Sequence, residues 1–197
     1  MATTNYGLLG SLLYEAPAPP KRRCFISYHH DNEREVQTFL ETYSNAEVFT
    51  HRALGLDMAN DIVDSNDTDY VMRRIREQYM QNTSVTIVMV GQNTWKRRYV
   101  DWEIAASLRN GFANPANALL GIKLPSYAYG IQKYPDRLND NLNAQGVADG
   151  TPCYARCIPY PTTSAELRTA IEEAHQRRQN QSHLINNTRA RFGYNRA

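Results

Sequence analysis

Residues 82–111 read NTSVTIVMVGQNTWKRRYVDWEIAASLRNG, and this stretch decides the fold because it contains a strand, a turn and a helix in succession. The strand is the run VTIVMV at residues 85–90, which is apolar, rich in β-branched side chains and ends at Gly91. A continuous run of this kind is typical of a parallel strand buried on both faces of its sheet. Gln92, Asn93 and Thr94 then supply turn chemistry. We therefore expect a central parallel strand followed directly by a loop.

The helix after this loop has one apolar stripe. Val100, Ile104 and Leu108 are spaced four residues apart, so they lie on one side of a helix. The Asn-Gly pair at residues 110–111 predicts where the helix ends.

One carboxylate, Glu103, lies beside that stripe. At about 100° per residue, Tyr99 and Glu103 share a flank of the helix. The flank of a helix just after a strand is expected near the strand's carboxyl end, where ligands of open α/β sheets bind. Position alone leaves two interpretations of Glu103 open: a reactive group, or a surface helix residue paired with an arginine.

The rest of the chain alternates between strands and helices. Strands are expected at residues 22–28, 47–49, 85–90, 118–122 and 154–158. Apolar side chains at helical spacing predict further helices near residues 32–43, 71–79 and 163–174. Such alternation gives a parallel sheet covered on both faces, and five strands in a chain of this size favour the order 2-1-3-4-5. The predicted fold class is α/β, a flavodoxin-like five-stranded parallel sheet with helices on both faces.

Three parts of the chain are expected. Residues 1–20 end in a proline cluster and form an N-terminal extension or linker, residues 21–176 form the domain, and residues 177–197 form a basic C-terminal tail. Five arginines and no acid follow Glu173, so the tail is either a solvated segment or a contact for a nucleic acid or an acidic partner. The polar segment 50–69 holds five aspartates and is expected to be a functional loop, although its spacing does not fit a calcium-binding EF-hand. Residues 126–152 predict a loop with one short helix.

Composition excludes several classes of protein. The 197 residues suit one domain, and a net charge of +2 argues against a nucleic-acid-binding protein. Cys24, Cys153 and Cys157 provide neither a disulfide framework nor zinc-site spacing, so no metal is expected. Neither G-x-G-x-x-G nor G-x-x-x-x-G-K-[ST] is present, which disfavours hydride-transfer Rossmann enzymes and P-loop NTPases. No apolar run is long enough to span a bilayer and no secretion signal is evident, so the predicted location is the cytoplasm, without a membrane contact.

Two blocks of the sequence resemble a known family. YVDWE at residues 99–103 resembles the Trp-x-x-x-Glu motif of TIR domains that cleave NAD, with Tyr99 in the place of the usual Trp. KRRCFISYH at residues 21–29, together with residues 82–86, the Arg97-Arg98 pair and residues 99–104, resembles the TIR-like signalling protein of bacterial Thoeris anti-phage systems. The resemblance covers roughly residues 21–124, while residues 1–20 match nothing.

The resemblance implies an enzyme with NAD as its substrate and no cofactor. Glu103 is then the catalytic carboxylate that steadies a positively charged ribose while nicotinamide leaves. The resemblance also implies that ADP-ribose is recyclised into a diffusible signal for a separate effector protein, after a phage-derived trigger and self-association.

The resemblance and residue chemistry together suggest substrate-binding residues. Phe25 and Tyr28 offer aromatic surfaces to nicotinamide or adenine, although Phe25 is equally well read as core. Ser27 and His29 match the family's loop and are candidates to contact ribose or phosphate. Arg97, with Lys96 and Arg98, precedes the helix and is a candidate for the pyrophosphate, or part of a solvated basic face. Tyr99 is expected to pack or hydrogen-bond near Glu103.

Two further interpretations stay open. One is a TIR-like interaction or sensor module without chemistry, which Tyr99 in place of Trp favours. The other is a nucleoside-processing hydrolase or transferase on the same fold.

Overall fold

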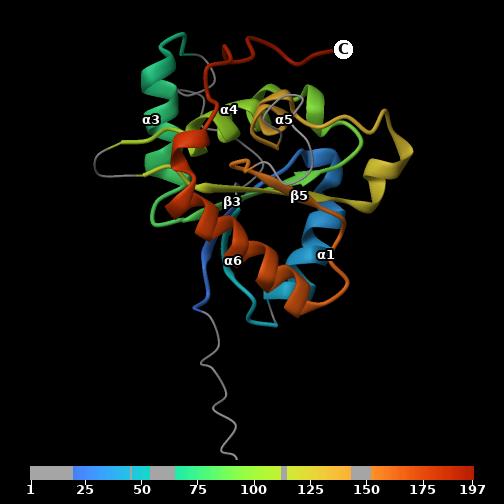
Figure 1. Ribbon diagram of the computed structural model, residues 1–197. Helices are drawn as coiled ribbons and strands as arrows, with labels where there is room; N and C mark the ends of the chain where they lie inside the picture. The colour runs from blue at the N-terminus through green and yellow to red at the C-terminus, as the bar shows by residue number, and fades with distance from the viewer. Residues whose placement is uncertain (1–19, 45, 54–64, 112–114, 143–151) are drawn as a thin grey trace, which may run out of the picture.

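A five-stranded, all-parallel sheet forms the centre of the protein (Figure 1). The computed structural model describes residues 20–44, 46–53, 65–111, 115–142 and 152–197. The strands are β1 (Arg23–Ser27), β2 (Thr50–Ala53), β3 (Val85–Val90), β4 (Ala118–Lys123) and β5 (Arg156–Ile158). Their order in the sheet is β2-β1-β3-β4-β5, which confirms the predicted flavodoxin-like order.

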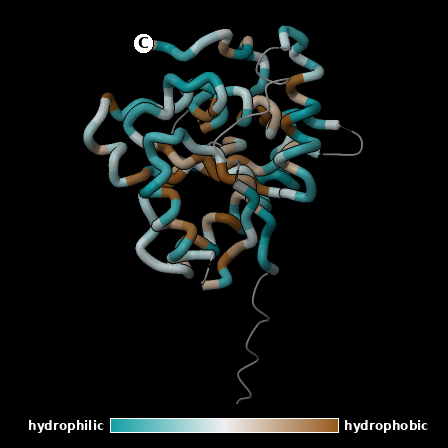
Figure 2. Tube along the Cα trace, turned by 180° about the vertical axis from the view of Figure 1, so that it is seen from behind, coloured by the Kyte–Doolittle hydropathy of each residue, from teal (hydrophilic) through white to brown (hydrophobic). Residues whose placement is uncertain are grey.

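Helices cover both faces of this sheet (Figure 1). Two of them, α1 (Glu33–Ser44) and α6 (Ser164–Asn180), pack on one face, and three, α3 (Thr68–Tyr79), α4 (Arg98–Ser107) and α5 (Asp136–Leu142), pack on the other. Short 3-10 helices span His30–Asn32, Thr94–Lys96, Pro125–Tyr129 and Ser182–Leu184. Hydrophobic residues gather in the middle of the molecule, between the two helix layers (Figure 2). The helix and 3-10 turn within residues 125–142 agree with the short helix expected there.

Alternation along β1 assigns its side chains to the two layers. Cys24 and Ile26 join the core under α1 and α6, whereas Phe25 packs under α3 and α4. Ser27, two residues after Phe25, points to the same side as Phe25 and reaches α4. Both faces of the strand are therefore buried, which is why its sequence shows no polar alternation.

The second strand lies three residues later than predicted. Glu47 adopts a φ of 58°, a left-handed conformation that belongs to a turn and not to a strand. Val48 and Phe49 are buried, but they fill the core beside α1 before the chain enters the sheet. Pairing with β1 begins at Thr50, whose N–H donates to the carbonyl of Arg22 at 3.1 Å. The expected strand at 47–49 was wrong, and most of the expected functional loop, residues 54–64, lies outside the described residues.

Helix α4 ends at Ser107, before the Asn-Gly pair that predicted its end. Its last carbonyl groups are taken by partners outside the helix. Arg76 of α3 donates to the carbonyl of Ala106 at 2.7 Å, and the N–H of Asn117 donates to that of Ser107 at 2.8 Å. The helix therefore stops where tertiary donors replace its own hydrogen bonds.

The C-terminal segment, residues 181–197, crosses α4. The carboxylate of Asp101 accepts from the Arg137 side chain at 2.9 Å and from the N–H of Phe192 at 2.9 Å. The Trp102 indole donates to the carbonyl of Phe192 at 2.7 Å. The predicted boundary at 176/177 lies inside α6, which ends at Asn180, and the segment after that helix makes contacts with both α4 and α5. No helix in the described part of the chain is both long and apolar enough to cross a bilayer.

The buried Asp101–Arg137 pair fixes this segment, so its removal is expected to be costly. The two side chains are 3% and 1% exposed. Asp101→Asn leaves the Arg137 charge buried without a counter-charge, and we expect it to lower the free energy of unfolding by on the order of 3 kcal/mol in denaturant titrations.

The control for this experiment is Glu47→Gln, which removes an exposed ion pair with Lys21 and is expected to leave the free energy of unfolding nearly unchanged. Equal effects of Asp101→Asn and Glu47→Gln would show that the segment is not held by this pair.

Candidate functional site

Glu103 lies in the middle of α4 and points inward, toward the carboxyl end of β1. Its side chain is buried, with the residue 4% exposed. The Ser27 hydroxyl, on the last residue of β1, donates to Glu103 Oε2 at 2.5 Å. Within the described residues Glu103 makes no ion pair, and its side chain is buried. The structure therefore contradicts the interpretation of Glu103 as a surface residue paired with an arginine.

Burial raises the pKa of Glu103 from an ordinary 4.5 to about 8, although the hydrogen bond from Ser27 lowers it in part. A carboxyl group with this pKa is mostly protonated at neutral pH. A positively charged ligand beside it would favour the carboxylate, because an opposite charge stabilises the ionised form. The site is therefore suited to hold a cation that arrives with the substrate.

Tyr28 follows Ser27, and the charge of Glu103 affects the ionisation of its hydroxyl group. Its pKa is raised, first by burial, then by the negative charges of Glu33 and Glu103. Its ring packs against the core under α1, where it is only partly buried. Tyr28 is thus a predicted aromatic residue within reach of solvent, with its ring on the α1 side of the sheet.

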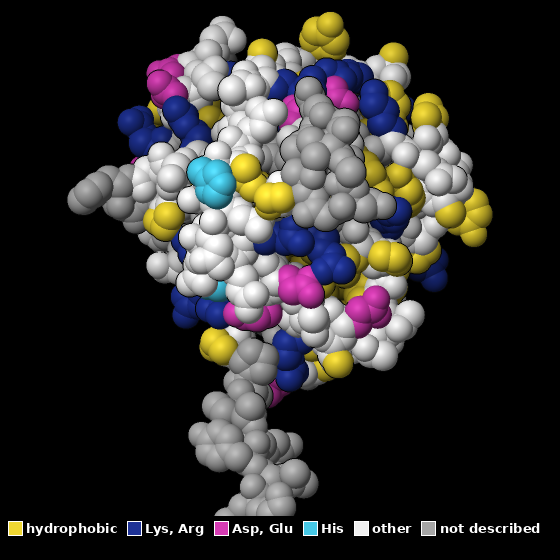
Figure 3. Space-filling model, in the orientation of Figure 1, with side chains coloured by type: hydrophobic (Ala, Val, Ile, Leu, Met, Phe, Trp, Pro, Cys, Tyr) yellow, Lys and Arg dark blue, Asp and Glu magenta, His cyan; other side chains and the backbone are white. Residues whose placement is uncertain are grey.

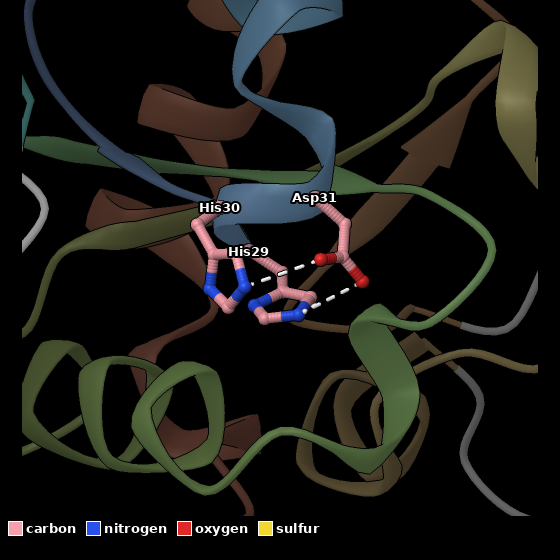
Figure 4. A group of neighbouring side chains, drawn as sticks. All are labelled: His29, His30 and Asp31. Atoms are coloured by element: carbon pink, nitrogen blue, oxygen red, sulfur yellow. Dashed lines mark ion pairs between the residues drawn. The ribbon is translucent and has the colours of Figure 1, made fainter.

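His29, Asp31 and Arg97 form a polar cluster at the start of the loop after β1, and Figure 4 draws His29 and Asp31 of this cluster. His29 Nε2 is 3.1 Å from Asp31 Oδ2, and the Arg97 guanidinium donates to the same oxygen at 3.2 Å. Asn93 donates to this oxygen at 3.3 Å. These contacts join the loop after β1 to the loop after β3, so the two predicted residues His29 and Arg97 meet at the carboxyl edge of the sheet.

His29 is neutral at physiological pH. Burial lowers its pKa to about 4, helped by the positive charge of Arg97 and opposed by Asp31. Its Nε2 atom is buried and makes no well-aligned hydrogen bond. A neutral imidazole carries one donor and one acceptor, and its Nε2 atom faces Asp31 here.

The sequence matches a family at the residues just described. The family described as "Thoeris protein ThsB, TIR-like domain" matches residues 25–129, more than half of the chain. The chain belongs to this Thoeris TIR-like family. A relative from Bacillus cereus (strain MSX-D12), named "Putative cyclic ADP-D-ribose synthase ThsB1", is 28% identical over 133 residues, which cover 66% of this chain and 67% of the relative. Ser27, Tyr28, His29 and Glu103 lie within the matched residues 25–129, and the match confirms the expected family and fold.

Phe25 and Tyr99 lie away from the mouth of this Thoeris TIR-like site. Phe25 is fully buried among the side chains of α3 and α4, which is its role as core. The Tyr99 ring packs edge-on against Trp102, with ring centres 5.8 Å apart, and its hydroxyl accepts from Arg98 at 2.8 Å. Both aromatic residues pack within the cluster formed by α3 and α4, and no side-chain hydrogen bond joins Tyr99 to Glu103 in the described structure.

Two polar residues of this Thoeris TIR-like site were not singled out from the sequence, Asp31 and Asn93. Both follow a strand of the sheet by a few residues, so their position at the carboxyl edge was available from the strand assignments. Their partners were not, because which loops meet depends on the order of the strands. Asn93 was read only as a turn former.

The same cluster contains a group that could hold a metal ion. The ligand atoms of His29, His30 and Asp31 lie within 4.8 Å of one another (Figure 4). Arg97 binds the same carboxylate and opposes a second positive charge there. The prediction of no metal stays a prediction.

Two clefts in the described part of the chain lie away from Glu103 and the polar cluster beside it. One, of about 530 Å³, lies between α3, α4 and the C-terminal segment, and the other, of about 380 Å³, lies beside the start of β1 and β2. Neither is lined by Glu103. Glu103 itself is buried in the described structure.

The raised pKa of Glu103 predicts a pH-dependent stability difference. Between about pH 4.5 and 8 the unfolded chain ionises Glu103 but the folded chain does not, so the wild type loses stability as the pH rises. Glu103→Gln removes this effect and keeps an acceptor for Ser27. Relative to the wild type, the free energy of unfolding of the variant is expected to rise by about 5 kcal/mol across that window in denaturant titrations.

Glu41→Gln, on the exposed face of α1, is the control for the loss of one negative charge. A stability difference between wild type and Glu103→Gln that does not change with pH would contradict the buried, protonated carboxyl.

Proposed function

We propose that this protein cleaves NAD, releases nicotinamide and joins the ends of ADP-ribose into a cyclic ADP-ribose-type signal. The observation that carries the proposal is the buried Glu103 carboxyl group, which is held by Ser27 at the carboxyl end of β1 and is unpaired with any cation of the described chain. Membership of the Thoeris TIR-like family and a relative named as a putative cyclic ADP-D-ribose synthase support the same activity.

The reaction needs one well-placed carboxylate. The bond between ribose C1′ and the nicotinamide nitrogen breaks, and its electron pair leaves with the nitrogen as neutral nicotinamide. The ribose becomes an oxocarbenium-like cation, which Glu103 stabilises across a site from which water is excluded. A nitrogen of the adenine or a ribose hydroxyl of the same molecule then attacks C1′, closes the ring and releases one proton.

The pKa of Glu103 suits this order of events. Before NAD binds, the carboxyl group is largely protonated, because the site is dry. The positively charged nicotinamide ring favours ionisation as it enters, so the carboxylate forms where the ribose cation will develop. The hydrogen bond from Ser27 then holds the carboxylate in place.

The polar cluster beside the carboxylate is suited to the rest of NAD. Arg97 is held at the sheet edge by Asp31 and has a buried Nε without a hydrogen-bond acceptor, so it is placed to bind the pyrophosphate. Neutral His29 is suited to a ribose hydroxyl, and the partly exposed Tyr28 to an aromatic base. NAD is the substrate in this proposal, and no cofactor takes part.

The cyclic product would act on a separate effector protein, as the anti-phage role of a Thoeris system requires. The effector would meet the signal and not this chain, so no direct complex between the two proteins is needed. Self-association and a phage-derived trigger are the proposed means of opening the covered site.

The direct test is the release of nicotinamide from NAD by wild type and Glu103→Gln. Because one carboxylate carries the charge stabilisation, we expect the variant to lose at least about a hundredfold in rate, measured by liquid chromatography with mass spectrometry of both products. Infected cells that carry either form supply the trigger.

Glu41→Gln serves as the control and is expected to keep wild-type rates. Nicotinamide release that survives Glu103→Gln would overturn the mechanism, and turnover of free nucleosides but not of NAD would favour a nucleoside-processing enzyme on this fold.

A second candidate is a TIR-like interaction module without chemistry. Two observations favour it: Tyr99 replaces the usual Trp, and Glu103 is covered in this structure. If cells expressing Glu103→Gln keep protection against phage and no nicotinamide is released under infection, the module is the better account.

A further inference from the structure

A cleft rich in arginine separates the C-terminal segment from α3 and α4. Its volume is about 530 Å³. The residues that line it include five arginines and no acidic residue of the described chain: Arg98, Arg109, Arg137, Arg189 and Arg191. Figure 3 shows Lys and Arg side chains gathered along the upper edge of the molecule, where Figure 1 draws the C-terminal segment. We call this site the arginine cleft.

Three of the five arginines have acidic partners. Arg137 pairs with the buried Asp101 at 2.9 Å, and Arg189 pairs with Asp140 at 2.7 Å. Arg109 pairs with Asp69 at the start of α3. The charges of these three guanidinium groups are balanced by acidic residues of the protein. Their ion pairs also hold together the elements that line the arginine cleft.

Arg98 and Arg191 have no such partner. Neither makes an ion pair with any residue of the described chain. Both lie over the ring of Trp102, with the guanidinium carbons 5.5 Å and 4.1 Å from its centre. The two groups therefore meet at one indole, one from the first turn of α4 and one from the C-terminal segment.

Arg191 is also incompletely satisfied. Its Nη1 atom is buried and has no hydrogen-bond acceptor. Burial lowers the pKa of Arg191, and the positive charge of Arg98 lowers it further, opposed by Asp101 and Asp67. Two like charges beside one indole and a buried donor without an acceptor are unfavourable, and an anion between the two guanidinium groups would relieve both effects.

We propose that the arginine cleft binds a phosphate-bearing small molecule, with a diphosphate group held between Arg98 and Arg191. The planar guanidinium fork matches two phosphate oxygens better than any other side chain does. Trp102 and Phe192 line the same cleft and supply an apolar wall for the rest of a nucleotide. The volume lies within the range of sites for small molecules.

This site differs from the one proposed for NAD cleavage. Glu103 does not line the arginine cleft, although it lies on the same helix as Arg98 and Trp102. A bound diphosphate would tie the C-terminal segment to α4. The inference rests on binding alone, so it stands or falls separately from the proposed reaction.

Calorimetric titration of the full chain with inorganic diphosphate tests the proposal. The wild type is expected to bind, and the double variant Arg98→Gln/Arg191→Gln is expected to bind at least about fiftyfold more weakly, because two charge-assisted contacts are lost. Arg34→Gln, an exposed arginine on α1 at the opposite face of the sheet, is the control and is expected to bind as the wild type does. No heat from the wild type at millimolar diphosphate, or undiminished binding by the double variant, would overturn the proposal.

A second measurement needs no variant. Butanedione modifies accessible arginines, and diphosphate is expected to protect Arg98 and Arg191 but not Arg34, as read by peptide mass spectrometry. Equal modification of all three with and without diphosphate would contradict the proposal even if the double variant fails to fold. A single-stranded oligonucleotide that binds more tightly than inorganic diphosphate, with an affinity that falls steeply with salt, would overturn a small-molecule site in favour of a nucleic acid.

Discussion

The hydrogen bond from Ser27 to Glu103 is the contact on which the site depends. It joins the end of β1 to the middle of α4 at 2.5 Å, so the strand and the helix fix one carboxyl group between them. Any shift of α4 along the sheet would break it. The elements that hold α4 therefore also hold the reactive group: Arg76 at its last carbonyl groups, Asp101 with Arg137 on its outer side, and the C-terminal segment across its first turns.

This arrangement combines burial with a polar edge. Burial alone makes the carboxylate costly, and the pKa of Glu103 rises accordingly. The loops that follow β1 and β3 bring His29, Asp31 and Arg97 together beside it. A buried carboxyl group next to charged and polar side chains at the edge of the sheet is suited to a substrate that carries both a cationic ring and an anionic pyrophosphate. The same helix presents Arg98 and Trp102 to a different cleft on its outer face, so α4 connects two sites of different chemistry.

The sequence predicted the sheet because each buried strand has a pattern of its own. The run at 85–90 and the change of period after it marked β3 and α4, and membership of the family agrees with the order of the strands. The second strand was misplaced because Val48 and Phe49 are apolar for a different reason: they fill the core beside α1 after a left-handed turn at Glu47. The packing of residues 181–197 was also not predictable, since its anchor is a buried aspartate on α4 that reads in sequence as an ordinary first-turn acid.

For the site, position drew attention to Glu103 but left its role open, and it did not predict the partners of this residue. The spacing from the strand placed the carboxylate on a flank of the helix, whereas the hydrogen bond to Ser27 depends on how far α4 lies along β1. The role of Phe25 could not be assigned from the sequence. An aromatic residue in a strand is compatible with a core position and with a ligand contact, and only the packing of Phe25 under α3 and α4 decides between them.

The ionisation of Glu103 can be observed directly by carbon-13 NMR of glutamate side chains, with Glu103→Gln to assign the signal. The account predicts a carboxyl pKa of about 8 in the free protein, and a lower pKa when a non-cleavable NAD analogue with a positive ring is bound. A carboxyl group that titrates near 4.5 and does not respond to the analogue would contradict the central claim.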